Sequence, residues 1–96
     1  MRPSIALQTY REQVRRIVLA HRASNVRVFG SVLRGEDTDD SDLDLLVEPT
    51  SEMSLMDIGA IRHELKSLLG VEVDVLTPNG LPDAYREKAL LESVPI

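Results

Sequence analysis

The hexapeptide DLDLLV, residues 42–47, decides the fold class; acidic and apolar side chains alternate over its first four residues, and two apolar residues follow. Successive side chains of a β-strand point to opposite faces, so three apolar side chains share one face: Leu43, Leu45 and Val47. Asp42, Asp44 and Leu46 share the other face, and the Cα atoms of the two aspartates lie roughly 6.6–6.8 Å apart. We therefore predict a strand over residues 42–48, ended by Pro49, that packs one face on a core and presents two carboxylates on the other.

Further strands and helices are expected on both sides of this segment. Apolar residues at three- and four-residue spacing predict a helix over residues 4–22, with Ser4 as its N-terminal cap and Asn25 breaking it. The β-branched and aromatic residues 26–29 predict a short strand. Gly30 then turns the chain.

The second half of the chain predicts a helix, a strand and a last helix. Ser54 followed by Asp57 is typical of an N-terminal cap, and Gly70 is typical of a C-terminal stop. Alternation over residues 71–77 predicts a third strand, and residues 82–92 predict the last helix. This order favours an α/β (α+β) fold, a small mixed β-sheet with helices packed mainly on one face.

Length and composition limit what the chain can be. Ninety-six residues suffice for one domain, residues 1–96, and 43% hydrophobic with 28% charged residues is ordinary for a globular protein. The absence of cysteine excludes disulfides and thiolate metal sites. No apolar run approaches the roughly 20 residues that span a bilayer. We therefore expect a cytoplasmic protein with no membrane partner.

The net charge of −5 is unevenly distributed. Residues 1–35 carry seven arginines and one glutamate, whereas residues 36–96 carry fifteen acids and four bases. We expect no direct binding to nucleic acid, because its phosphates need neutralising cations and the chain is acidic overall. The basic third suits an anionic small molecule or an oppositely charged protein partner; alternatively, it is an arginine-rich helix face in solvent.

The paired carboxylates indicate chemistry. Like charges on one strand face repel, and a divalent cation removes the repulsion; hard oxygen ligands suit Mg²⁺ or Mn²⁺. If the third strand pairs beside the second, Asp74 joins Asp42 and Asp44, and three acids can hold two metals. Gly30 and Ser31 would offer backbone N–H groups and a hydroxyl to a phosphate. The alternative is an acidic strand that only faces solvent.

These residues resemble a known signature. The pair Gly30-Ser31 is followed, after ten residues, by the triplet DLD that begins at Asp42. This spacing is similar to the Gly-Ser-x₁₀-Asp-x-Asp signature of the DNA polymerase β-like nucleotidyltransferase superfamily. The flanking residues and the length look most like its minimal nucleotidyltransferase (MNT) branch.

The resemblance implies a role for each matching residue. Gly30 and Ser31 would bind the triphosphate of ATP as substrate. Arg34 would contact a phosphate or, alternatively, pair with an aspartate and fix the loop. Asp74 would bind metal or take the proton of the attacking hydroxyl. The resemblance implies a two-metal site for Mg²⁺ or Mn²⁺ on three catalytic acids: Asp42, Asp44 and Asp74.

The resemblance also implies a partner. Many small MNT proteins are antitoxins encoded beside a HEPN-domain ribonuclease toxin, and known members transfer AMP from ATP to a tyrosine of that toxin. We therefore expect the antitoxin of a type VII-like HEPN/MNT system, acting as a metal-dependent protein adenylyltransferase. Two alternatives stay open: an antitoxin that neutralises the toxin by binding without catalysis, and a nucleotidyltransferase that acts on a small molecule.

Overall fold

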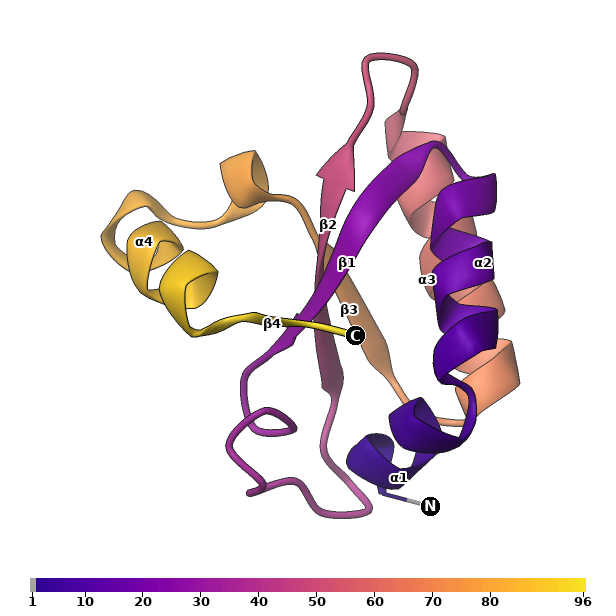
Figure 1. The fold of residues 1–96 in the computed structure, drawn as a ribbon, viewed down its shortest axis with the longest axis vertical. Helices are drawn as coiled ribbons and strands as arrows, with labels where there is room; N and C mark the ends of the chain where they lie inside the picture. Colours follow the sequence, from indigo (N-terminus) through magenta and orange to yellow (C-terminus); the bar gives the residue numbers. More distant parts are fainter. Residues whose placement is uncertain (1) are drawn as a thin grey trace.

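The fold is built around a four-stranded sheet (Figure 1), found in a computed structural model that describes residues 2–96. The strands lie in the order β3-β2-β1-β4. Their bounds are β1 Ala23–Phe29, β2 Leu43–Pro49, β3 Val73–Leu76 and β4 Val94–Pro95. β1 pairs antiparallel with β2 and β4, whereas β2 pairs parallel with β3. The predicted mixed sheet is therefore confirmed.

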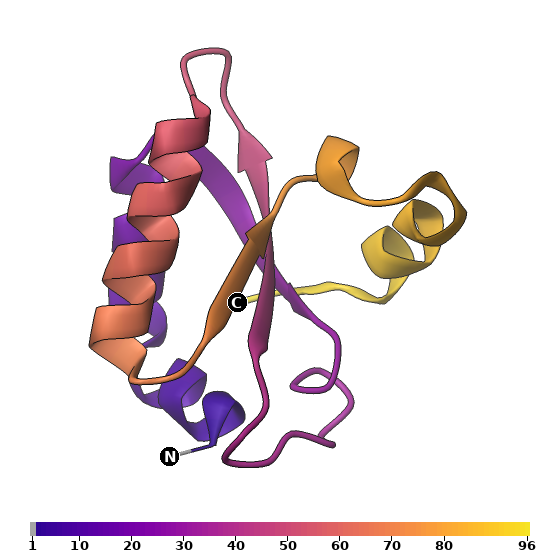
Figure 2. The same ribbon diagram turned by 180° about the vertical axis from the view of Figure 1, so that it is seen from behind.

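Helices lie on both sides of the sheet, three on one face and one on the other (Figures 1 and 2). Their bounds are α1 Pro3–Thr9, α2 Arg11–Ala20, α3 Leu55–Leu69 and α4 Asp83–Glu92. The first three cover one face, and α4 lies over the other together with a 3₁₀ turn, η1 (Pro78–Gly80). The prediction that helices pack mainly on one face is confirmed. Within residues 2–96, no helix is long and apolar enough to cross a membrane.

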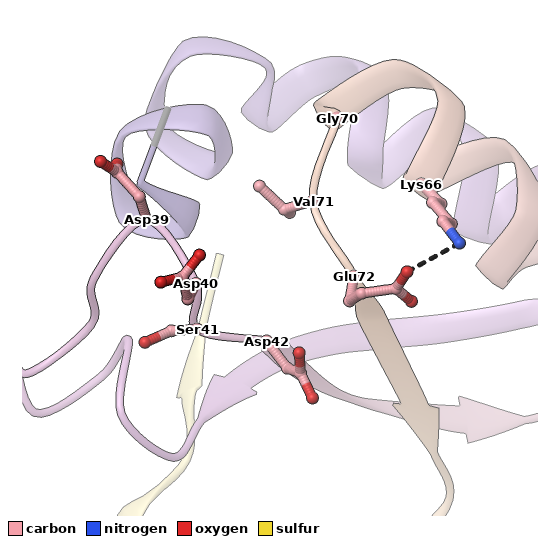
Figure 3. A pocket seen from close by; sticks show the side chains of 8 residues that line it. All are labelled: Asp39, Asp40, Ser41, Asp42, Lys66, Gly70, Val71 and Glu72. Atoms are coloured by element: carbon pink, nitrogen blue, oxygen red, sulfur yellow. Dashed lines mark ion pairs between the residues drawn. The ribbon is translucent and has the colours of Figure 1, made fainter.

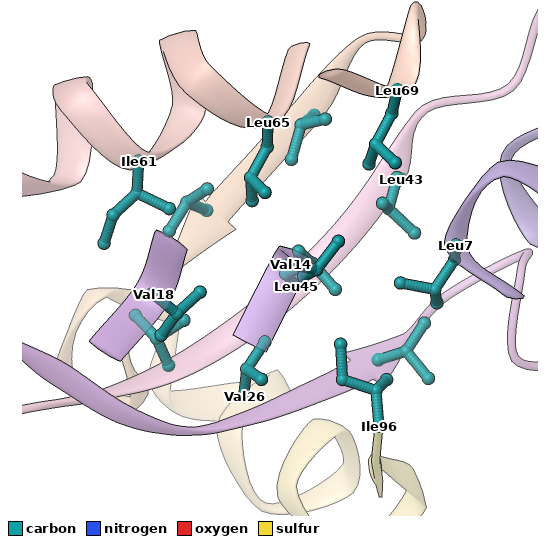
Figure 4. Packing of buried hydrophobic residues seen from close by; sticks show 14 of the residues in the cluster. Leu7, Val14, Val18, Val26, Leu43, Leu45, Ile61, Leu65, Leu69 and Ile96 are labelled. Atoms are coloured by element: carbon teal, nitrogen blue, oxygen red, sulfur yellow. The ribbon is translucent and has the colours of Figure 1, made fainter. Parts of the chain in front are cut away.

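The alternation along β2 supplies apolar side chains to both faces of the sheet. On the face of α1, α2 and α3, a large core contains Leu43, Leu45, Val47, Val14, Val18, Ile61 and Leu65 (Figure 4). Leu46 points to the other face and packs in a small cluster with Phe29, Leu81 and Ala89 of α4. Burying each such leucine stabilises the fold by about 1.5–3 kcal/mol, so β2 is anchored from both sides.

The single helix predicted over residues 4–22 is wrong, because two helices occupy this segment. The chain leaves helical geometry at Tyr10, where φ is −112° and ψ is 23°. Ser4 is not the N-terminal cap, since Pro3 already belongs to α1. The backbone N–H of Ser4 instead donates to Asp37 Oδ2 at 2.9 Å. The first helix is therefore capped by a residue more than thirty positions away.

Strand ends also differ from the predictions. β1 begins at Ala23, because a register shift between Ser24 and Arg27 accommodates Asn25 within the strand at φ +48°. Asn25 is thus not the residue that breaks the helix. β2 extends to Pro49, which pairs with Ala23 instead of stopping the strand before it.

Two differences concern the edges of the sheet. β3 is shorter than the predicted residues 71–77, and β4 was not predicted. The backbone N–H of Ile96 donates to Val26 O at 3.2 Å, and Arg15 Nε donates to Ile96 O at 2.7 Å. These bonds hold the last residues of the chain against β1 and α2.

The predicted limits of α3 are confirmed. Ser54 and Asp57 form a reciprocal capping box, and Gly70 ends the helix. Leu55 and Met56, in contrast, are 86% and 84% exposed and take no part in the core.

Asp37 fixes the loop that leads into β2. Its buried carboxylate accepts from the N–H of Ser4, and Arg2 Nη2 donates to Oδ1 at 3.3 Å. The hydrogen bond from the N–H of Ser4 is the main cause that holds the pKa of Asp37 below its usual value, and the charge of Arg2 lowers this pKa to a lesser extent. The ionised form is therefore the one that the fold stabilises.

We expect Asp37→Asn to lower the free energy of unfolding at pH 7 by about 1–3 kcal/mol, the scale of a weakened buried hydrogen bond to a charge. Because the pKa of Asp37 is lowered on folding, its stabilisation exists above the unfolded value near 3.8 and is lost as pH falls through the folded value. The difference from wild type should shrink below about pH 4. Urea unfolding of wild type and Asp37→Asn at pH 7 and below about pH 4 tests this prediction. Asp39→Asn, at an exposed position, is the control. Equal stability of wild type and Asp37→Asn at pH 7 would contradict the prediction.

Candidate functional site

The acids of β2 and β3 meet in register. Asp44 lies directly beside Asp74 in the parallel pairing, and their neighbours Leu45 and Val75 are buried in the large core. Asp44 and Asp74 therefore point to the opposite face, the one that α4 overlies. The expected pairing of the third strand beside the second is confirmed.

The surroundings of Asp44 disfavour its ionised form. Burial raises its pKa most, the Asp74 carboxylate beside it raises it further, and Asp42 adds a smaller effect, so that the pKa reaches about 6. Arg34 opposes the shift. The ionised carboxylate of Asp44 is thus unfavourably placed; a bound cation would stabilise it, and a proton taken from a substrate would neutralise it.

The turn after β1 presses its backbone against this carboxylate. Gly30 has φ +80°, and a Cβ added there would lie 2.4 Å from Asp44 Oδ2. A side chain at position 30 is therefore excluded by both conformation and space. In the tight turn that follows, the N–H of Arg34 donates to Gly30 O at 3.2 Å and the N–H of Glu36 donates to Ser31 O at 2.9 Å. Half-buried Ser31 lies at the start of this turn, next to Gly30.

Arg34 has a different partner from the predicted one. Its Nε lies 3.2 Å from Glu36 Oε2, and both side chains are exposed, so the ion pair is with a glutamate and not with an aspartate. Arg34 also lines a small cavity of about 80 Å³ together with Gly30. It remains a candidate for phosphate contact.

Asp42 lines an acidic cavity whose lining does not include Asp44 or Asp74. This cavity, of about 400 Å³, is lined by Asp39, Asp40, Ser41, Asp42, Lys66, Gly70, Val71 and Glu72 (Figure 3). Lys66 Nζ forms an ion pair with Glu72 Oε1 at 2.7 Å. Among residues 2–96, no three acidic or histidine side chains are already gathered around one point as metal ligands. Asp44 and Asp74 thus form the close pair, and Asp42 acts on Asp44 through its charge.

Sequence reasoning did not assign α4 to the site. Tyr85 is 45% exposed and lines the small cavity beside Gly30, together with Lys88 and Glu92. The spacing of these three residues places them on one side of a helix, which was the available signal. What the sequence lacked was the direction from which α4 crosses the sheet.

The chain matches the family described as nucleotidyltransferase domain over residues 7–96. It belongs to this family. The nucleotidyltransferase is therefore an enzyme whose fold brings the Gly30 turn and the Asp44–Asp74 pair to one face of the sheet.

Similar proteins agree with this assignment. The nucleotidyltransferase is 39% identical over 80 residues to a candidate protein adenylyltransferase of Methanocaldococcus jannaschii, covering 83% of this chain and 86% of that protein. It is 32% identical over 91 residues to the protein adenylyltransferase MntA of Thermococcus cleftensis, covering 86% and 92%.

Solved structures share the fold. A candidate minimal nucleotidyltransferase superposes with a TM-score of 0.87 at 43% identity, covering 97% of this chain and 95% of that one. A toxin–antitoxin structure with AMP-PNP superposes with a TM-score of 0.74 at 15% identity, covering 88% and 69%. At that identity the second likeness concerns the fold alone.

Proposed function

We propose that this nucleotidyltransferase is an antitoxin that transfers AMP from ATP to a tyrosine hydroxyl of a HEPN-domain toxin. The observation that carries the proposal is the alignment of Asp44 with Asp74 against the backbone of Gly30, because it places acids beside a candidate phosphate-binding turn. The names of the relatives, protein adenylyltransferases, support a protein acceptor.

The reaction would be an in-line displacement. The acceptor oxygen forms a bond to the α-phosphorus of ATP, the bond to the bridging oxygen breaks, and pyrophosphate leaves. Gly30 and Ser31 would hold the triphosphate, with Arg34 near it. Asp74 would take the proton of the attacking hydroxyl, since it is exposed on the face from which an acceptor can approach.

The acids fit a divalent cation by their chemistry. Carboxylates are the hard oxygen ligands that Mg²⁺ or Mn²⁺ prefers. Burial first, and the neighbouring Asp74 and Asp42 carboxylates second, raise the pKa of Asp44, and a cation would stabilise the ionised form against both effects. Asp42, Asp44 and Asp74 would hold the ion. When bound, the metal would neutralise charge on the phosphates. The residues themselves orient the nucleotide and accept the proton.

Mg²⁺ should therefore stabilise the folded protein in the absence of any acceptor. At ten times the dissociation constant we expect the free energy of unfolding to rise by about 1.4 kcal/mol. Replacing Asp42 and Asp44 by Asn should remove this gain. Thermal unfolding with and without Mg²⁺ at constant ionic strength measures it. A gain of equal size in the double variant would show that the ion binds elsewhere.

The size of the site favours an acceptor that brings its own surface. The cavity beside Gly30 holds only about 80 Å³, whereas pockets that enclose drug-sized molecules measure about 300–1,000 Å³. A small-molecule acceptor would thus find little enclosure next to the turn. A docking protein can supply the missing walls.

The proposal is tested by measuring the intact mass of the HEPN-type protein encoded beside this gene, after incubation with the chain, ATP and Mg²⁺. We expect the mass to rise by one or more AMP units, and peptide mapping to place them on tyrosine. The Asp42→Asn/Asp44→Asn variant should add none. A stable complex without a mass change would overturn catalysis in favour of neutralisation by binding, and neither modification nor complex would overturn the partner.

A further inference from the structure

Hydrogen bonds connect helix α4 to the η1 turn before it and to β1 just after its end. Arg86 Nε donates to Pro78 O at 2.6 Å and its Nη2 donates to Leu81 O at 2.8 Å, which ties the helix to the η1 turn. At the other end, Arg27 of β1 donates through Nε to Ser93 Oγ at 2.7 Å and through Nη2 to Ser93 O at 2.9 Å. The backbone of α4, from which side chains reach the site, is therefore held in a defined place.

Ala89 sets the rotation of the helix. It is buried against Phe29, the residue before Gly30 and the partner of Asp44 across the strand pair. This contact brings the preceding residue, Lys88, to the cavity of about 80 Å³ beside the Gly30 turn. Arg34 also lines that cavity.

The lining of this cavity holds two cationic side chains, Arg34 and Lys88, and one carboxylate, Glu92. Lys88 has no ion-pair partner within 4.0 Å in the part of the chain that the structure describes, whereas Arg34 is paired with Glu36. Backbone N–H groups of the turn are neutral donors, and the nearby carboxylates repel an anion. A triphosphate placed at the turn thus needs a cation, and Lys88 is the unpaired one in the lining.

We propose that Lys88 binds a phosphate group of the nucleotide, so that α4 forms one wall of the nucleotide site. The proposal rests on the use of ATP by this site and not on the identity of the acceptor. The ammonium group would approach from α4 while the turn contacts the phosphates from β1. Lysine is suited to this role as a compact charge with three donors.

Direct binding of a non-hydrolysable ATP analogue with Mg²⁺, measured by calorimetry, tests the assignment without an acceptor. We expect Lys88→Ala to weaken binding at least about tenfold, the effect of losing a hydrogen bond between charged groups. Lys88→Arg should recover most of the affinity. Arg16→Ala, which removes one positive charge from an exposed position of α2, should bind as wild type does.

The nature of the lost contact is tested with adenosine. Lys88→Ala should leave adenosine binding unchanged, because adenosine lacks phosphates; an equal loss for both ligands would assign a structural role and overturn the proposal. Unchanged binding of the ATP analogue in Lys88→Ala, or no binding in wild type, would also overturn it. If Lys88→Ala weakens binding of the ATP analogue but no HEPN-type protein is modified, the role of Lys88 stands and only the proposed acceptor is wrong.

Discussion

Replacing Asp44 by Asn is expected to reduce nucleotidyl transfer on the order of 10³-fold while making the metal-free fold slightly more stable. The loss of activity follows because the carboxylate lies between Asp74 and the Gly30 backbone, where charge has to be balanced during phosphoryl chemistry. The gain in stability follows because burial and the neighbouring acids raise the pKa of Asp44 to about 6.

The difference in stability between wild type and Asp44→Asn depends on pH. The pKa of the Asp44 carboxyl is raised on folding, here from 3.8 to about 6. Such a carboxyl stabilises the fold most when the pH lies below the lower value, and it loses this stabilisation as the pH rises through the higher value. Wild type should therefore lose stability between about pH 4 and pH 6 relative to Asp44→Asn. At pH 7, after allowance for solvent screening at a half-exposed group, the variant should be more stable by about 1 kcal/mol.

Urea unfolding in the presence of EDTA, together with initial rates of AMP transfer with Mg²⁺, measures both effects. Glu48→Gln removes a carboxylate from the exposed end of the same strand and should change neither quantity appreciably. An Asp44→Asn variant that is less stable at pH 7 would contradict the repulsion inferred here. A variant that keeps full activity would remove Asp44 from the site.

Replacing Gly30 by Ala should have the second large effect, and Gly35 offers a matched control. Both glycines adopt positive φ, +80° and +71°, so either substitution should cost roughly 1–2 kcal/mol of stability through the backbone. Only at position 30 does the new Cβ meet an atom, Asp44 Oδ2 at 2.4 Å; at position 35 nothing lies within 4 Å. The carboxylate must move in one variant and not in the other.

We therefore expect Gly30→Ala to lose at least about 10²-fold in activity, since small displacements of catalytic groups have effects of this size. Gly35→Ala should stay within a few-fold of wild type, although its thermal stability falls. Paired measurements of the melting temperature and of kcat/KM separate the two effects. Equal losses of activity in the two variants would mean that the backbone conformation, and not the contact with Asp44, is what the site requires.

The sequence predicted the parts of this protein whose signal is local. The alternation in residues 42–47 defined the strand, its buried face and its acidic face, because period-two patterns depend only on neighbouring residues. Ser54, Asp57 and Gly70 defined α3 for the same reason. The meeting of Asp44 and Asp74 followed once the third strand was placed beside the second.

What the sequence missed depends on distant contacts. The break at Tyr10 carries no glycine or proline, and the apolar spacing continues across it. β4 has two residues, too few to show alternation, and forms only because β1 offers an edge. The partner of Arg34 is an exception, because Glu36 lies only two residues further on and was the nearest acid in sequence. The position of Lys88 depends on how Ala89 packs under α4.

Core residues and site residues alternate along β2, so a strand paired in the wrong register destabilises the fold as well as the site. A slip of one residue in strand register would exchange the two faces, sending Asp44 into the large core and Leu45 to the face of the acids. Burying an unpaired carboxylate costs far more than a small domain of marginal stability can tolerate. Misaligned chains should therefore unfold or be degraded instead of accumulating as inactive folded protein. For this enzyme, a cooperative unfolding transition is thus also evidence that the acids are correctly aligned.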